Sequence, residues 1–208
     1  MLDRRFTPLV IVLVLSLGPF DLIETRWLEI LVRGGTLAAA AYALGRGRRS
    51  RVGVLLLLMP ILGLHVLDLG LSSATLQIAS VASASVFLIF VLWVVIVEVL
   101  GARRVNPDVL MGGIAIYLLF GYLFAMFYIL VERFQPGSFT SIDWNSFLAE
   151  QMQYFSFVTL TSVGYGDISP VSYFARRLAI MEAVFGQIYL AVFVGRLVGY
   201  SFPEQENQ

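Results

Sequence analysis

The residues of greatest chemical interest form one short polar stretch, LTSVGYGDIS, which runs from Leu160 to Ser169. It carries two glycines, one tyrosine ring and one carboxylate, and it lies between two long apolar segments. Non-helical chain at membrane depth must be buried in protein or must line a water-filled path. The stretch therefore predicts such a path, and the elements on either side must position it.

The composition indicates that lipid is the natural solvent of the chain. Of its 208 residues, 59% are hydrophobic and 13% are charged, which is unlike a soluble domain. Cysteine is absent and His65 is the one histidine, so the sequence offers no thiolate nucleophile and no sulfur metal site. We therefore expect neither an enzyme nor a cofactor. Fourteen basic and fourteen acidic residues cancel, which gives no indication of nucleic-acid binding or of a soluble partner.

Hydropathy predicts an all-α integral membrane protein with six transmembrane helices. Each apolar segment is long enough to cross a hydrocarbon core of ~30 Å, which takes ~20 helical residues. The segments cover approximately 7–23, 27–45, 52–71, 74–100, 109–132 and 171–200. The first begins like a secretory signal, but no cleavage site of the A-x-A type follows, so we expect a retained helix.

Arginine placement predicts the orientation of these segments. Arg4 and Arg5 precede the first segment, further arginines fill the loop at 46–51, and Arg103 with Arg104 lies between the fourth and fifth segments. All three places fall on one side if six helices cross, and arginine-rich loops are cytoplasmic. We therefore expect a multi-pass protein of the cell membrane with both termini cytoplasmic and the insert 133–170 outside.

The insert reads as three pieces. A polar loop with the breaker pair Pro136–Gly137 comes first. The segment WNSFLAEQMQYFSFVTLT follows, with Asn145 or Ser146 as a cap, and it predicts a helix too short to span and too apolar for water. The extended stretch SVGYGD comes last. This order is typical of a re-entrant helix followed by a loop that lines a pore.

The motif TLTSVGYGD and its flanking segments resemble the potassium-channel family, over approximately residues 109–200. The resemblance implies a passive potassium channel with a pore helix and selectivity filter between helices five and six. The expected domains are a four-helix bundle over 1–105, a pore domain over 106–200 and a short cytoplasmic tail over 201–208. Because a single chain cannot close a ring around an ion, we expect a homotetramer in the lipid bilayer.

The residue types in the stretch also suit the coordination of K⁺ by backbone carbonyls. Carbonyl oxygens from four copies of an extended strand can replace the hydration shell of K⁺ if they all point inward. That direction requires alternating right- and left-handed residues, and glycine adopts the left-handed conformation at little cost. The expected ion-binding residues are Ser162, Val163, Gly164, Tyr165 and Gly166. Their expected supports are Thr161, Trp144, Tyr154 and Phe155.

Two positions beside the filter allow alternatives. The family usually has threonine where this chain has Ser162, and serine lacks the methyl group that restricts the rotamer. The innermost ion site should therefore be looser, and a weakly selective cation channel is the alternative. Asp167 forms either a ring of carboxylates at the outer mouth or a structural hydrogen bond to Tyr154 or Trp144.

The last helix offers further candidates. Gly186 resembles the gating hinge of the family, and close helix packing is the alternative. Gln187, Leu190 and Val194 recur at helical spacing and could face a cavity below the filter, although a buried hydrogen bond explains Gln187 nearly as well. Glu182 should lie behind the filter, with Arg177 as a possible partner.

Charges elsewhere bear on gating. Arg33, His65 and Asp68 fall near the outer ends of segments two and three, where they either join two helices or sense external pH. Segment four has no arginine or lysine, so it cannot sense voltage by moving charge. The membrane subunit of a potassium transporter is a remaining alternative, but we find no internal repeat of the kind such folds show.

Overall fold

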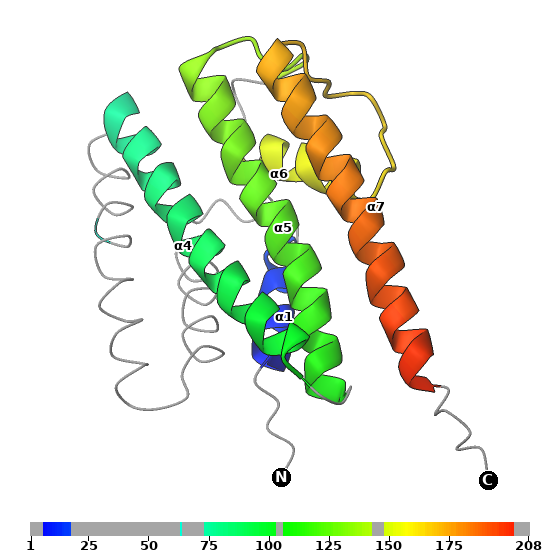
Figure 1. Cartoon of the computed structure of the whole chain (residues 1–208). Coiled ribbons are helices and arrows are strands. Elements are labelled where there is room, and N and C mark those ends of the chain that lie inside the picture. Colours follow the sequence, from blue (N-terminus) through cyan, green and yellow to red (C-terminus); the bar gives the residue numbers. More distant parts are fainter. Residues whose placement is uncertain (1–5, 18–62, 64–72, 103–105, 143–147, 202–208) are drawn as a thin grey trace, which may run out of the picture. The chain divides into compact units, whose positions relative to one another are not determined.

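The computed structural model describes residues 6–17, 63, 73–102, 106–142 and 148–201, and the regular structure in these ranges is helical. The helices there are α1 (Phe6–Leu15), α4 (Ala74–Leu100), α5 (Pro107–Phe134), α6 (Leu148–Leu160) and α7 (Tyr173–Ser201) (Figure 1). Within the same ranges, extended backbone pairs only in an isolated bridge between Phe139 and Pro170. The all-α class is thus confirmed for the part of the chain that the structure describes.

Helices α4, α5 and α7 are long and apolar enough to cross a membrane, with spans of 27, 28 and 26 residues. Helix α4 has the bounds that hydropathy predicts, and α5 and α7 differ from their predicted segments by two residues or fewer at each end. The predicted second and third segments lie outside the described residues, and so do Arg33, His65 and Asp68.

The first predicted segment is wrong as a continuous helix over 7–23. Helix α1 has 10 residues and ends at Leu15, and a turn follows at Ser16 and Leu17. The Ser16 hydroxyl donates to the carbonyl of Leu13 at 2.8 Å. Pro19 comes next but one after the turn, and proline disfavours a continued helix at the residues before it. Ten helical residues cannot cross a hydrocarbon core alone. The rest of that segment lies outside the described residues.

The chain divides into two compact units, and the first contains α1, α4 and α5 up to Leu123. The backbone N–H of Phe6 donates to the Asp108 carboxylate at 3.0 Å. Asp108 lies in the first turn of α5, where an acidic side chain is favourable for the helix. A Cβ added at Gly112 would lie 2.5 Å from the Val99 side chain and 3.0 Å from that of Phe6. Glycine at this position therefore allows close packing of three helices.

The second unit contains the rest of α5 with α6 and α7. Three buried rings form its centre. The ring centre of Tyr128 in α5 lies 4.9 Å from that of Phe155 in α6 and 5.4 Å from that of Phe139 in the loop after α5. Phe139 and Phe155 are 5.2 Å apart, and all three contacts are edge-to-face. Such aromatic pairs add to the stability that burial alone provides. This cluster fixes α6 against α5.

The loop after α5 is held by a buried carboxylate. Glu132 is 1% exposed and accepts hydrogen bonds from the backbone N–H groups of Gly137, at 2.7 Å, and Phe139, at 3.2 Å. Beyond these residues, Thr140 donates through its backbone to the carbonyl of Ser169 at 2.9 Å, and its Oγ1 accepts from the N–H of Ser169 at 3.0 Å. The loop therefore anchors the chain that leaves the polar stretch.

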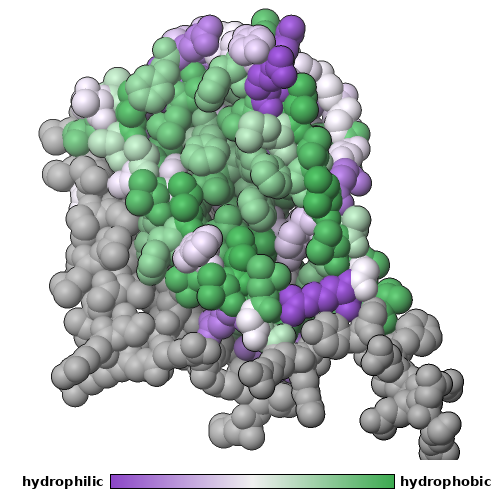
Figure 2. Space-filling model, in the orientation of Figure 1, coloured by the Kyte–Doolittle hydropathy of each residue, from purple (hydrophilic) through white to green (hydrophobic). Residues whose placement is uncertain are grey.

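Helix α7 keeps much of its apolar surface exposed within a single chain. Side chains along its length that are half exposed or more include Ile180, Val184, Ile188 and Val192. Figure 2 shows apolar side chains over the middle of the visible face, with hydrophilic ones near its upper and lower ends. An apolar helix surface of this extent requires lipid or another protein chain to cover it.

Candidate functional site

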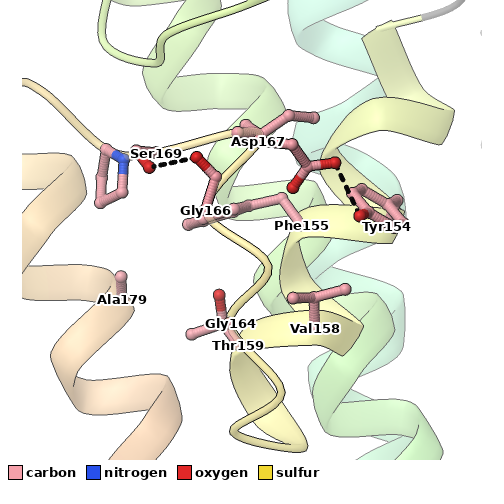
Figure 3. A pocket seen from close by; sticks show the side chains of 11 residues that line it. Tyr154, Phe155, Val158, Thr159, Gly164, Gly166, Asp167, Ser169 and Ala179 are labelled. Carbon is pink, nitrogen blue, oxygen red and sulfur yellow. Dashed lines mark hydrogen bonds between the residues drawn. The ribbon is translucent and has the colours of Figure 1, made fainter.

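The polar stretch leaves the end of α6 and turns back along that helix. The N–H groups of Val163 and Gly164 both donate to the carbonyl of Val158, at 3.0 and 3.3 Å, and the N–H of Ser162 donates to that of Thr159 at 2.9 Å. The Thr161 hydroxyl caps the helix end through the Phe157 carbonyl at 2.6 Å. These bonds close α6 and start an extended strand, which Figure 3 shows rising past Gly164 and Gly166.

The backbone of this strand alternates in handedness. Ser162, Gly164 and Gly166 have φ of 58°, 59° and 80°, whereas Val163 and Tyr165 between them do not have positive φ. The sequence predicts the left-handed region for the two glycines. It does not predict a left-handed serine, because a residue with a Cβ adopts this conformation at a cost of about 1–2 kcal/mol. A pattern that repeats every second residue is the one that turns successive carbonyls toward one side.

A hydrogen bond from α7 holds the strained serine. The Gln187 amide donates through Nε2 to the Oγ of Ser162 at 2.8 Å. Gln187 is exposed within the single chain, so the bond lies at a surface of this unit. This bond joins α7 to the polar stretch rather than to another helix and is exposed rather than buried, so it is not the buried interhelical bond that the sequence offers as an alternative, and a cavity-facing Gln187 stays a prediction. Leu190 and Val194, one and two turns further along, are 38% and 53% exposed, and whether they face a cavity stays a prediction.

The Asp167 end of the strand is held by α6. The Tyr154 hydroxyl donates to the Asp167 carboxylate at 2.7 Å (Figure 3). The Tyr154 ring stacks on that of Tyr165, with ring centres 6.4 Å apart and an interplanar angle of 1°. The bond holds the pKa of Asp167 below its usual range, because Tyr154 stabilises the ionised form. It raises the pKa of Tyr154 to about 12. Trp144, the other expected partner, lies outside the described residues together with Asn145 and Ser146.

A cavity of about 190 Å³ lies behind the strand. Val158 and Phe155 of α6 and Ala179 of α7 line it, together with backbone at Gly164 and Gly166 (Figure 3). Phe155 also belongs to the ring cluster described above, so it supports α6 as well as the space behind the strand. Among the described residues, no group of three or more histidine, aspartate or glutamate side chains could hold a metal ion.

The chain is similar to a known protein family and to several known proteins. Residues 113–201 match the family described as "Ion channel". The chain is 36% identical over 112 residues to Protein LctB of Bacillus caldotenax, a match that covers 51% of this chain and 81% of that protein. The chain belongs to the LctB family. In the part of the chain that the structure describes, three helices are long and apolar enough to cross a membrane. This LctB-family chain is a membrane protein, and its match to an ion-channel family indicates a channel rather than an enzyme.

Two further relatives are named as potassium channels. The LctB-family chain is 35% identical over 81 residues to the inward rectifier potassium channel Kirbac3.1 of Paramagnetospirillum magnetotacticum, which covers 37% of this chain and 24% of that protein. It is 32% identical over 72 residues to two pore potassium channel c of rice (Oryza sativa subsp. japonica), over 35% of this chain and 16% of that protein. The chain thus spans a quarter or less of either channel. No solved structure matches it significantly.

The structure changes the interpretation of Glu182 on α7. Glu182 does not pair with Arg177, because its carboxylate accepts from the hydroxyls of Tyr128 and Ser156, both at 2.5 Å. The Arg177 guanidinium lies instead over the Tyr173 ring, 5.1 Å from its centre. The sequence could not identify Tyr128, which is 54 positions away from Glu182.

Gly186 is a site of close packing. A Cβ there would lie 2.3 Å from the carbonyl oxygen of Leu160 and 3.1 Å from its side chain. Of the two interpretations, packing is therefore supported by contacts, and a hinge at this glycine stays a prediction.

Replacing Tyr154 by phenylalanine should make conduction more sensitive to acid on the side of the membrane that Asp167 faces. The variant keeps the ring that stacks on Tyr165 but removes the hydroxyl that stabilises ionised Asp167. The pKa of Asp167 should then rise toward its ordinary value, so the carboxylate becomes protonated at a higher pH than in the wild type. Current amplitude recorded while the pH of each side of the membrane in turn is varied between about 3 and 6 should show the acid midpoint displaced upward on one side. An identical midpoint in both proteins would contradict the assigned role of the hydrogen bond.

Replacing Gln187 by leucine should reduce the unitary current. The change removes the donor to Ser162, so the left-handed serine can relax away from its position. Losing one neutral hydrogen bond of about 1 kcal/mol predicts a change of roughly fivefold in the population of chains whose Ser162 keeps its left-handed conformation. Val198→Ala, near the end of the same helix, is the control: the Val198 side chain is 51% exposed, and the variant should conduct as the wild type does. Single-channel recording measures both variants, and equal currents in the two would rule out a role for this bond.

Proposed function

We propose that this chain is the subunit of a homotetrameric channel that conducts K⁺ passively and selectively across the cell membrane. The observation that carries the proposal is the alternation of positive φ at Ser162, Gly164 and Gly166. That alternation suits four strands whose carbonyls line one axis and replace the hydration shell of the ion. The coordinating oxygens would be those of Ser162, Val163, Gly164 and Tyr165.

The surroundings of the strand support this role. Its inner end is bonded to α7 and its outer end to α6, so both ends are fixed within one subunit. In the proposed pore, α6 is the re-entrant pore helix, α5 the outer helix and α7 the inner helix. The exposed apolar surface of α7 supports contact with neighbouring copies. The ion-channel family model matches residues 113–201, which include this strand, and two relatives of the chain are named as potassium channels.

The proposed topology has six transmembrane helices, with both termini in the cytoplasm and the polar stretch near the outer face. Helix α4 carries no arginine or lysine over its 27 residues. Each elementary charge moved across 100 mV supplies about 2.3 kcal/mol, and voltage sensors need several. The channel is therefore proposed to open without a charged fourth helix.

Ion flux from vesicles tests the proposal against its alternatives. Purified protein in vesicles loaded with K⁺ should release it rapidly into a Na⁺ bath, and planar bilayers should show unitary current steps. Equal release of K⁺ and Na⁺ would favour the weakly selective cation channel that Ser162 leaves open. Slow flux that saturates, without unitary steps, would favour the membrane subunit of a potassium transporter.

A further inference from the structure

Glu182 is a buried carboxylate to which the proposed conduction path assigns no role. It lies in α7 with no exposed surface. One of its oxygens accepts from the Tyr128 hydroxyl of α5 and the other from the Ser156 hydroxyl of α6, each at 2.5 Å. Burying a carboxyl group is costly unless its oxygens are hydrogen-bonded. Both oxygens are satisfied here, and the residue joins three helices at one point.

The surroundings make these bonds strong and stiff. Tyr128 is fully buried, and its ring is enclosed by Phe139 and Phe155. Ser156 is fully buried as well. A hydrogen bond in such a low-dielectric environment is electrostatically stronger than one in water, and losing one partner leaves the other unsatisfied. The carboxylate therefore fixes the helices that it joins more firmly than an exposed contact would.

The filter strand depends on how two of those helices are placed. Its outer end is bonded to Tyr154 of α6 and its inner end to Gln187 of α7. Ser156 lies two positions after Tyr154, and Glu182 lies five positions before Gln187. The bond between Ser156 and Glu182 thus connects the two helices close to both holding groups. A change in the relative position of α6 and α7 would move the two ends of the strand with respect to each other.

We infer that Glu182 is a positioning residue for ion selectivity, acting through the placement of α6 against α7. The inference rests on the proposed function, since it concerns the selectivity of the same strand. Glu182 itself is not proposed to touch an ion. Its bond to Ser156 sets the geometry of the filter, whereas its bond to Tyr128 anchors the pair to the outer helix.

The two hydroxyls provide a matched test. Ser156→Ala removes the bond between α6 and α7, and Tyr128→Phe removes the bond to α5 while keeping the ring cluster. We expect Ser156→Ala to lower the ratio of K⁺ to Na⁺ permeability about fivefold, the factor for one ordinary hydrogen bond. Tyr128→Phe should change it by less than about twofold. Reversal potentials in planar bilayers measure the ratio, and equal losses in the two variants, or none in either, would overturn the inference.

Variants at position 182 test the carboxyl group itself. Glu182→Gln can keep both contacts, because its amide oxygen accepts from one hydroxyl and its amide nitrogen donates to the other. It should retain the wild-type permeability ratio, whereas Glu182→Leu, similar in size, should lose selectivity. If size-exclusion chromatography shows that the leucine variant does not assemble, the comparison of Ser156→Ala with Tyr128→Phe tests the inference instead. A wild-type current without K⁺ preference would instead contradict the proposed function, so the two failures are distinguishable.

Discussion

Gly164→Ala should abolish the selective potassium current while the protein still assembles. Gly164 has φ of +59°, and an added Cβ would meet no atom within 4 Å, so the cost is conformational rather than steric. An L-residue in this region costs about 1–2 kcal/mol, which gives roughly 4–8 kcal/mol over four proposed subunits. Relief of that strain rotates the backbone and turns a carbonyl away from the axis. Single-channel recording should show current reduced about a thousandfold or more.

Gly137→Ala is the matched control for this prediction. Gly137 also has positive φ, of +83°, and a Cβ added there would also meet open space, but it lies in the loop after α5 rather than in the strand. Alanine keeps the N–H that donates to Glu132. The same backbone strain placed there should leave permeation unchanged. A K⁺-selective current of wild-type size in the Gly164 variant would show that strand handedness is not what makes the filter.

Gly186→Ala should have the second-largest effect on stability and current, because it disturbs the packing of α7 against the end of α6. The new Cβ would be 2.3 Å from the Leu160 carbonyl oxygen, so α7 would have to move away from the end of α6. Overpacking of this kind costs about 1–3 kcal/mol at each site. The displacement would also strain the bond from Gln187, the next residue, to Ser162. We expect a lower melting temperature of the assembled protein and loss of selective current.

Gly195→Ala separates packing from flexibility. Gly195 lies in the same helix, but a Cβ there would meet nothing within 4 Å. Alanine is the better helix former by about 1 kcal/mol, so this variant should be as stable as the wild type or more so. If Gly186 acted only as a hinge, its alanine variant would melt like the Gly195 variant and differ in open probability alone. That outcome would contradict the packing role.

The long helices are predictable because their apolar residues leave few alternatives. Helix α4 has the predicted bounds because Ser73 precedes it, Gly101 follows it and the residues between them are mostly apolar. Helix α1 is shorter than predicted because hydropathy does not register Pro19, whose ring would clash with the carbonyl of Leu15 in a continued helix. The sequence indicates where apolar segments lie better than where a helix stops.

The backbone conformation of the site is predictable at its glycines, because glycine adopts the left-handed region at little cost. Gly164 and Gly166 are left-handed as predicted, whereas left-handed Ser162 is not foreseen, because serine adopts that conformation only when other contacts hold it. The partners of Glu182 depend on tertiary packing between three helices, which local patterns do not encode. Close contact at Gly186 is likewise invisible without the position of Leu160.

The central claim, selective K⁺ conduction through this strand, is tested most directly by a bi-ionic reversal potential. Wild-type protein in a planar bilayer would be recorded with KCl on one side and NaCl at equal concentration on the other. We predict a reversal potential far from zero, of about 59 mV for each tenfold preference for K⁺, and its loss in Gly164→Ala. A wild-type reversal potential at zero would contradict the claim.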